Sequence, residues 1–403
     1  MTLCLCNIST VEYLRSARVL PRAVMRSLSA ERFAPRASDV ELLARGGFAC
    51  LSMPVHLLVP RASDRRRLKR ATCHACSEAL IPGSILRIAR DVCSASPELC
   101  FLHLASSLTL PRLVRLGFEL CGSYRLSASN PAGFVKGDPL TSVAELGRFL
   151  EAAGSARGAV LAKRALGYVL DGSASPMETI LVMLLCLPPR WGGYGLPAPR
   201  MNARVDVTKR ARMASAKGYY VCDLLWPAQN VAVEYDSDAY HTGAERIASD
   251  ASRRNALSYL GIAVVTVTRA QVLDCGGMDK TARAIAKLLG KRLRFDDRTW
   301  KPGPPRPEAR ASELLARGRL RRGCGKVAEI APNVWISAAQ KRLPQQNTRS
   351  RKTRRAAAPR KSAHLARSLP LCRRYGPSGA LSGRPARLWM FSDGVMAGKG
   401  RRV

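Results

Sequence analysis

The chain has 403 residues and a formal net charge of +37, so it is long enough for two or three domains and favours a polyanionic partner, most economically nucleic acid; an anionic membrane surface or plain solubility also fits the charge. Its 13 cysteines are spread over too great a length for a small disulfide-stapled scaffold, and no secretion signal begins the chain, so we expect a reduced, cytoplasmic protein. No stretch reaches the ~18 apolar residues of a transmembrane helix, so no membrane-spanning segment is expected.

The N-terminal part of the chain, residues 1–135, is predicted to form an α+β region. Apolar spacing distinguishes the helices in it from the strands, which are rich in β-branched and aliphatic residues. The expected elements are a helix at residues 11–20, strands at 48–51, 54–60 and 85–88, and a helix at 97–108.

A group of cysteines in this region raises the question of zinc. Cys73, His74 and Cys76 have ligand-like spacing, and Cys93 and Cys100 follow. The second pair of cysteines is separated by six residues instead of two, which is not typical of a zinc site. Buried or incidental thiols are the favoured interpretation.

Residues 136–174 are predicted to be a helical connector to the next region. An apolar helix then follows at residues 179–187, and its start is well marked: Ser175 suits the N-cap, Pro176 the first helical position, and Glu178 lies three residues after the cap. These three residues predict where the helix begins.

Residues 175–295 show the order helix, hairpin, helix, strand, helix, which indicates an α/β layer built around a mixed sheet. A strand buried on both faces is expected from one nearly continuous β-branched run, residues 262–267. The other elements expected here are the helix at 179–187, a hairpin at 219–236, and helices at 244–260 and 280–289.

The C-terminal part, residues 296–403, is expected to be a mostly disordered basic tail. Residues 301–403 hold 25 Lys and Arg against 4 Asp and Glu, a net charge of +21, which leaves +16 for residues 1–300. A segment with so few aliphatic clusters cannot build a core. It would add nonspecific affinity for phosphates or be a passive extension, and reading GC-rich DNA in an unproductive frame gives a similar composition.

The predicted hairpin gathers three carboxylates. If it is symmetric about the bond between Ala228 and Gln229, Asp223 and Glu234 lie directly across from one another, with Cβ atoms roughly 4.5–5.5 Å apart. Side chains alternate along a strand, so Asp236 shares the face of Glu234. The three acidic side chains are therefore expected to converge.

Such a convergence needs an offset, because two like charges at ~5 Å repel by about 3 kcal/mol at an effective dielectric near 20. A divalent cation, a shared proton or neighbouring basic side chains would supply it. Carboxylate oxygens suit Mg²⁺ or Mn²⁺, which often share phosphate oxygens of a substrate. The sequence therefore suggests a metal site for phosphodiester chemistry; the alternative is a sheet edge whose acids face solvent.

Residues 175–290 resemble a nuclease family in the order and spacing of their polar residues. The family is the DUF559 and very-short-patch-repair-like branch of the PD-(D/E)XK nucleases, whose restriction-endonuclease-like fold is a mixed sheet flanked by helices. The matching positions are Glu178, Asp223, Glu234, Asp236, His241, Asp250, Arg253, Arg254, Leu257 and Gly261.

The resemblance implies a role for each acidic residue and for the histidine. Asp223 and Glu234 would ligate Mg²⁺ or Mn²⁺, and Glu178 would complete the acidic shell as a further ligand. Asp236 would stand where the wider superfamily often has Lys. His241 would act as general base or contact a phosphate.

The resemblance also implies DNA contacts from the helix at residues 244–260. Arg253 or Arg254 would bind the DNA backbone, and Arg246 lies on the same predicted helix. Upstream, the basic run at residues 61–70 and the segment 93–105 give a loose likeness to an AbiEi-like antitoxin module, which implies a toxin–antitoxin-type protein partner or a homodimer.

Several of these residues also have an explanation that is structural and needs no role in catalysis or DNA binding. Glu178 would be only the glutamate of a capping box, worth about 1 kcal/mol of helix stability. His241 would be a loop histidine without a role in catalysis, and Arg253 and Arg254 would form a solvated helix face.

Three functions remain open from the sequence. The leading one is a Mg²⁺-dependent DNA endonuclease. The second is a catalytically degenerate nucleic-acid-binding regulator that uses the same fold. The third is an antitoxin-like partner protein whose interface lies in the N-terminal region.

Overall fold

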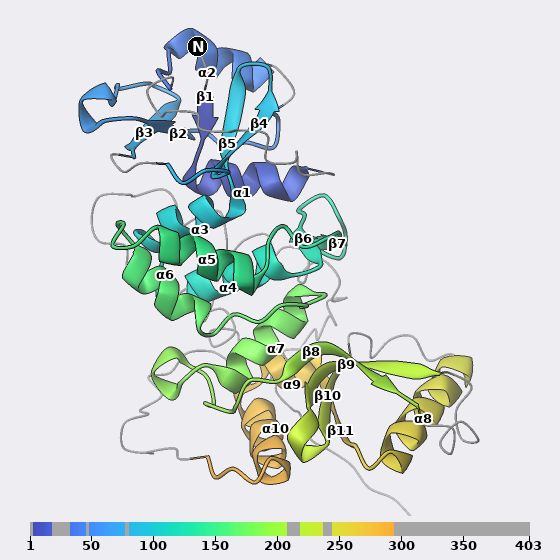
Figure 1. Ribbon diagram of the computed structural model, residues 1–403. Coiled ribbons are helices and arrows are strands. Elements are labelled where there is room, and N and C mark those ends of the chain that lie inside the picture. The colour runs from blue at the N-terminus through green and yellow to red at the C-terminus, as the bar shows by residue number, and fades with distance from the viewer. Residues whose placement is uncertain are drawn as a thin grey trace, which may run out of the picture. The chain divides into compact units, whose positions relative to one another are not determined.

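Two mixed sheets with helices, and a helical region between them in the sequence, make up the described part of the chain (Figure 1). The computed structural model describes a set of segments, all of which fall within one contact unit, Met1–Pro344. The segments are residues 3–17, 33–45, 48–76, 80–207, 218–236 and 244–293. The expected tail, residues 296–403, lies outside them.

The N-terminal sheet has five strands in the order β3-β2-β1-β5-β4. Within it β1 pairs in parallel with β5 and antiparallel with β2. Its buried side chains come mainly from the three central strands, β2, β1 and β5. The elements are β1 (Leu3–Leu5), α1 (Asn7–Ser16), α2 (Ala37–Arg45), β2 (Val55–Val59), β3 (Ala71–Ala75), β4 (Ile85–Ala89) and β5 (Val92–Ala95).

Sequence patterns located part of this sheet. The strands expected at residues 54–60 and 85–88 are confirmed as β2 and β4, and the helix expected at 11–20 is α1, which begins at Asn7 and ends at Ser16. The strand expected at residues 48–51 is wrong, since this segment is a turn. A cis peptide bond at Met53–Pro54 follows it, directly before β2.

The helical region packs around an aliphatic core, to which α3, α4 and α6 contribute buried faces. The helices expected at residues 97–108 and within 136–174 are confirmed as α3 and as the pair α5 and α6. The elements are α3 (Pro97–Ala105), α4 (Leu110–Cys121), β6 (Tyr124–Leu126), β7 (Phe134–Lys136), α5 (Val143–Ala152) and α6 (Ala159–Leu166).

The second large sheet has four strands in the order β11-β10-β9-β8. The predicted hairpin is confirmed: β9 and β10 are antiparallel and joined by a short turn, which ends at Asn230 with φ 53°. Strand β11 pairs in parallel with β10, so the sheet is mixed. The elements are α7 (Pro176–Cys186), β8 (Arg200–Asp206), β9 (Tyr219–Trp226), β10 (Val231–Asp236), α8 (Ala244–Tyr259), β11 (Ala263–Thr268), α9 (Arg269–Leu273) and α10 (Cys275–Leu288).

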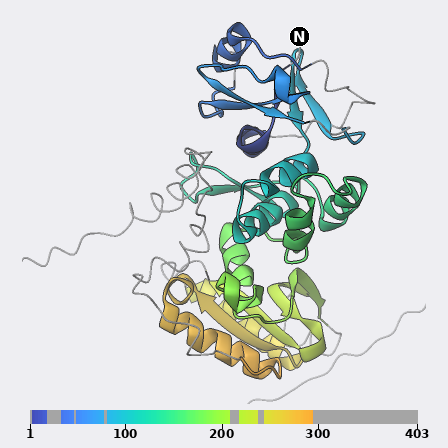
Figure 2. The same ribbon diagram turned by 90° about the vertical axis from the view of Figure 1, so that its left-hand side faces the viewer.

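Helices cover both faces of this sheet (Figures 1 and 2). Ala256 and Leu257 of α8 are buried in one cluster with Ala232 of β10. On the other face Val231 and Val233 share a cluster with residues of α7, α9 and α10. The mixed α/β architecture expected from the sequence is thus present, with the hairpin at the centre of the sheet.

Two features of this sheet differ from expectation. Strand β8 was not predicted, because its sequence, RMNARVD, is mostly polar and contains a single β-branched residue, Val205. Strand β11 was expected to be buried on both faces, but it lies at the sheet edge, and Val267 is its one fully buried residue. A β-branched run therefore does not distinguish a central strand from a half-covered edge strand.

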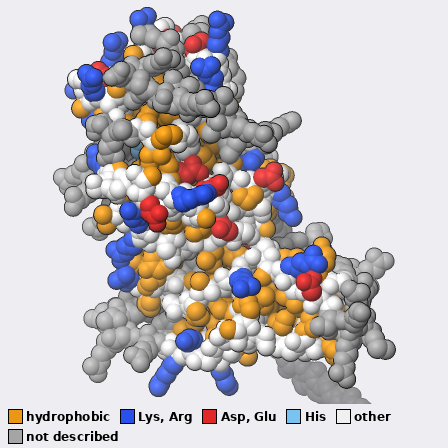
Figure 3. Space-filling view, in the orientation of Figure 1, with side chains coloured by type: hydrophobic (Ala, Val, Ile, Leu, Met, Phe, Trp, Pro, Cys, Tyr) orange, Lys and Arg blue, Asp and Glu red, His pale blue; other side chains and the backbone are white. Residues whose placement is uncertain are grey.

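Basic side chains are scattered over the surface rather than gathered into one patch on the face shown in Figure 3. A few acidic side chains lie among them. Within the described residues no helix is both long and apolar enough to cross a membrane.

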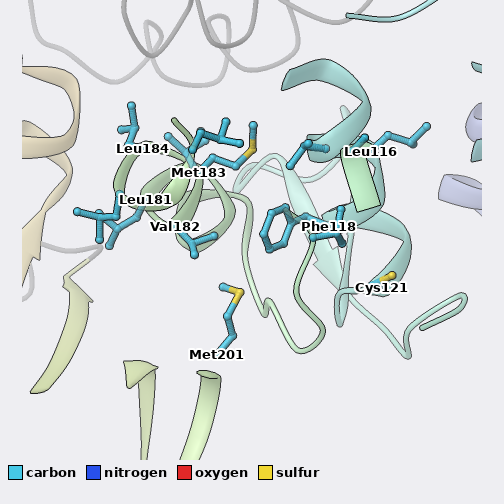
Figure 4. Packing of buried hydrophobic residues seen from close by; sticks show 14 of the residues in the cluster. Leu116, Phe118, Cys121, Leu181, Val182, Met183, Leu184 and Met201 are labelled. Carbon is cyan, nitrogen blue, oxygen red and sulfur yellow. The ribbon is translucent and has the colours of Figure 1, made fainter. Parts of the chain in front are cut away.

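The core of the second sheet is continuous with that of the helical region through α7. Nine of its eleven residues are buried, since the helix is apolar on all sides. In Figure 4, Phe118 of α4 and Val182 of α7 lie close together, with Met201 of β8 beside them. The packing of α7 between α4 and the sheet fixes the position of its first turn, which contains Glu178.

Candidate functional site

The candidate site lies where the pairing of β9 with β10 ends. The last registered pair is Val233 with Leu224. The next positions along the two strands are Glu234 and Asp223, as the symmetric hairpin predicted. Instead of continuing the ladder, Asp223 accepts a hydrogen bond from the backbone N–H of Tyr235 at 2.7 Å through its carboxylate. Asp223 thus replaces a backbone partner and is held beside β10.

Burial and a neighbouring negative charge raise the pKa of both carboxyl groups. Burial raises the pKa of Asp223 to about 6, the charge of Glu178 adds to the rise, and the hydrogen bond from Tyr235 opposes it. Burial raises the pKa of Glu234 to about 7, and the charge of Asp223 adds to it. The two groups are therefore close enough to influence one another, and they titrate near neutral pH.

A basic side chain from α8 supplies part of the offset that the acidic pair requires. Nη2 of Arg253 lies 2.7 Å from each carboxylate oxygen of Glu234 and also donates to the backbone carbonyl of Val221. The charge of Arg253 lowers the pKa of both acids and so limits their rise. Arg253, expected to contact DNA, thus faces the acidic pair in this structure.

Glu178 approaches the pair from the first turn of α7 and is 8% exposed. The side chain of Ser175 caps the helix by accepting from the N–H of Glu178. The Glu178 carboxylate in turn accepts from the N–H of Ala174 at 2.9 Å and from the side-chain amide of Asn202 at 2.6 Å. Glu178 therefore bonds the residue before the N-cap instead of completing the capping box that its structural alternative states, and its charge also reaches Asp223.

Asn202 is a site residue that the sequence patterns did not reveal. Register places it level with Asp223, because its neighbours Met201 and Ala203 pair with Leu224 and Cys222. Its φ is 44°, a left-handed conformation that Asn tolerates better than most residues. A single Asn inside an undetected strand gives no signal in sequence; only the register of β8 brings it to the site.

The other predicted site residues lie in different positions, and some fall outside the described residues. Asp236 is the last residue of β10, half-buried and two positions after Glu234. Arg254 is an exposed residue of α8. Arg246 belongs to the same helix, but its side chain lies outside the described residues, and so does His241 as a whole. The structure thus brings together Asp223, Glu234, Glu178 and Arg253.

The donor set fits a divalent cation through two carboxylates. Asp223 and Glu234 offer hard oxygen ligands, and Mg²⁺ is often held by one or two carboxylates with waters and phosphate oxygens as its other ligands. Within the described residues no group of three or more His, Cys, Asp or Glu side chains is arranged to hold a metal ion. Among these residues, the cysteines and histidine of the considered zinc site are not arranged around a metal ion either. The pair is therefore the donor set that the structure offers.

Comparisons with known proteins identify no relative. No family model matches the chain, and neither a curated protein nor a solved structure does. The site has to be interpreted from its own geometry.

Proposed function

We propose that the protein is a Mg²⁺- or Mn²⁺-dependent DNA endonuclease that hydrolyses phosphodiester bonds at Asp223 and Glu234. The observation that carries this proposal is that the two carboxyl groups follow the last registered pair of β9 and β10, where each is partly buried and has a raised pKa, and where the charge of Asp223 acts on Glu234. Groups perturbed in this way occur preferentially at functional sites. The net charge of +37 supports DNA as the substrate.

The chain's own residues would divide the work. Ionised Asp223 and Glu234 would hold the cation, and the Tyr235 N–H and Asn202 keep the site in register. A bound Mg²⁺ supplies a water of lowered pKa and neutralises charge on the scissile phosphate. Arg253, one side chain away, would bind a phosphate oxygen when Glu234 is engaged by the cation.

The order of elements supports a restriction-endonuclease-like fold for this region. A helix with an acidic first turn, strand β8, an antiparallel hairpin, a helix and a strand parallel to the second arm of the hairpin follow in this order, and the acidic residues come from the first helix and the hairpin. His241, proposed as general base, and Arg246 and Arg254, proposed as DNA contacts, complete the proposal.

Nicking of supercoiled plasmid tests the proposal. Wild-type protein with Mg²⁺ or Mn²⁺ is expected to nick the plasmid, and EDTA is expected to stop it. Glu234→Gln and Asp223→Asn keep the shape of each side chain but remove its charge, so each is expected to slow nicking about 100-fold or more, because the cation loses a ligand.

Asp206→Asn is the matched control. Asp206 lies on neighbouring β8, its side chain is 71% exposed, and it pairs with Arg204 at 2.7 Å. This variant is expected to nick like the wild type. Absence of metal-dependent nicking in the wild type, or undiminished nicking by Glu234→Gln, would overturn the proposal.

A second function is favoured by one specific observation, the contact of Arg253 with both oxygens of Glu234. A catalytically degenerate, DNA-binding regulator would retain such an arginine, whose positive charge offsets the negative charge of the acidic pair. In that case salt-dependent DNA binding persists, with no nicking, in the wild type and in Asp223→Asn alike.

A further inference from the structure

A cavity of about 670 Å³ lies far from the acidic pair in sequence, among the elements of the N-terminal sheet and the helical region. Its volume falls within the range of small-molecule sites. It is lined by residues of α1, β2, β3, α3, α4 and the segment before α6. None of Glu178, Asp223 and Glu234 lines it.

Three helices begin at or directly beside this cavity. Asn7 and Ile8 begin α1, Thr109 is the N-cap residue of α4, and Arg157 directly precedes Gly158, the N-cap residue of α6. The first N–H groups of a helix have no partner inside it, and the helix dipole makes that end favourable for an anion. Helices of 10, 12 and 8 residues therefore direct positive potential toward one cavity.

These helix ends lack the caps that the other helices have. No side-chain hydrogen bond caps α1, α4 or α6. Oγ1 of Thr109 is covered, and no partner for it is found among the described residues. By contrast, five helices that start elsewhere are each capped by a side chain, namely that of Ser96, Ser142, Ser175, Thr268 or Asp274.

Close packing brings two of the ends together. Gly158 has φ 93°, and a Cβ atom there would lie 2.9 Å from the carbonyl oxygen of Leu102 in α3. Glycine thus lets the start of α6 approach the segment that leads into α4.

The charged side chains that line the cavity have one sign. Arg65, Arg112 and Arg157 line it, and no Asp or Glu is among its described lining residues. Arg112 lies in the first turn of α4, so its charge adds to the potential of that helix end. Arginines beside helix N-termini are a recurrent arrangement for phosphate groups.

Three histidines give the cavity neutral polar groups as well. Nδ1 of His56 and Nε2 of His74 are 2.8 Å apart, and the two rings stack with centroids 4.9 Å apart. Burial lowers the pKa of His56, and it lowers the pKa of His74 and of His103 to about 4. At neutral pH the rings are uncharged, and the bond between His56 and His74 leaves one ring nitrogen of each for a ligand.

We propose that this cavity binds a nucleoside phosphate, either a free nucleotide or the phosphorylated 5′ end of a nucleic acid strand. The three helix ends and the arginines take the phosphate. The base lies against the apolar lining, which includes Leu99, Leu102 and Phe149, with the histidine edges available for hydrogen bonds. The site stands apart from the proposed nuclease centre and does not depend on it.

Calorimetric titration of the full-length protein in EDTA tests the proposal. The probes are ATP, adenosine and inorganic phosphate, together with one single-stranded DNA oligonucleotide that carries either a 5′-phosphate or a 5′-hydroxyl. ATP is expected to bind saturably, and tighter than either adenosine or phosphate. A stronger preference for the 5′-phosphorylated strand would identify a strand end as the source of the phosphate.

Paired variants separate the cavity from general charge. Arg65→Gln/Arg157→Gln removes two exposed arginines of the lining and is expected to weaken binding about tenfold or more. The matched control, Arg66→Gln/Lys163→Gln, removes two exposed cations nearby in the sequence that do not line the cavity. It is expected to bind like the wild type.

Two outcomes would overturn the proposal. One is the absence of saturable binding for every phosphate-bearing probe. The other is equal loss of binding in both double variants, which would mean that only net charge matters. Neither outcome bears on plasmid nicking, so the two proposals fail separately.

Discussion

Two sets of interactions act in opposite directions on the pKa values of Asp223 and Glu234. Burial and a nearby negative charge, that of Glu178 for Asp223 and that of Asp223 for Glu234, favour the protonated forms. Arg253 favours the ionised form of both groups, and the Tyr235 N–H favours that of Asp223. The first pair of influences prevails, so both groups keep a proton to higher pH than in an unfolded chain. A cation that binds the pair must therefore displace protons, and its affinity should rise from about pH 6 to about pH 8.

The unfolding free energy should depend on pH, because the folded protein keeps these protons to higher pH than the unfolded chain does. As pH rises from about 4 to about 7, an unfolded chain releases its carboxyl protons while the folded state keeps them, so this contribution to stability is present at low pH and lost through the folded pKa values. The unfolding free energy of the wild type is expected to fall relative to that of Asp223→Asn/Glu234→Gln by on the order of 1–3 kcal/mol. Urea denaturation at several pH values without divalent cations measures this difference.

The control is again Asp206→Asn, which removes an exposed carboxylate of β8. This variant keeps Asp223 and Glu234, so its unfolding free energy is expected to retain the pH dependence that the pair causes. A pH-independent difference for the Asp223→Asn/Glu234→Gln variant would contradict the assignment of raised pKa values to the pair.

Among the elements, the contact between α7 and β8 is the one that completes the site. The amide of Asn202 donates both to the Glu178 carboxylate at 2.6 Å and to the carbonyl of Gly172 at 2.9 Å. The buried start of α7 is thereby tied to a strand whose pairing partner among the described strands is β9. The left-handed backbone of Asn202 is what lets one side chain reach both partners.

Replacing Asn202 separates these two contributions. Asn202→Gly retains the backbone freedom but loses two hydrogen bonds, one to a buried carboxylate, and is expected to cost about 1–3 kcal/mol of unfolding free energy. Asn202→Ala loses the same bonds and adds left-handed strain, so it should cost about 1 kcal/mol more. Thermal or urea unfolding at neutral pH measures both. Equal stability of the alanine and glycine variants would show that the backbone at this position relaxes.

The sequence predicted the elements better than their arrangement. The start of α7 was predictable because Ser175, Pro176 and Glu178 act locally, and the hairpin because its turn is central and its arms are β-rich. Asn202 was not predictable, because its role depends on β8, whose polar sequence pairs by long-range register. Arg253 was recognised as basic, but the sequence alone could not show that the packing of α8 places its side chain beside Glu234.

At the scale of the whole molecule, charge is divided between two parts of the chain. Residues 301–403 contribute +21 of the +37, and residues 1–300 retain +16. On the face in Figure 3 the described basic side chains are dispersed, so that face marks out no single DNA-binding patch. Affinity for DNA should therefore come from both parts and depend on salt.

Deletion of residues 301–403 tests this division. DNA binding by the shortened chain is expected to persist at low salt, because +16 remains, but the slope of log affinity against log salt should be smaller, since fewer counterions are released. Fluorescence anisotropy with a labelled duplex at several salt concentrations measures both slopes, and circular dichroism of the shortened chain checks that it remains folded. Complete loss of binding by a folded shortened chain would place the DNA contact in residues 301–403 and remove the charge argument for DNA at Asp223 and Glu234.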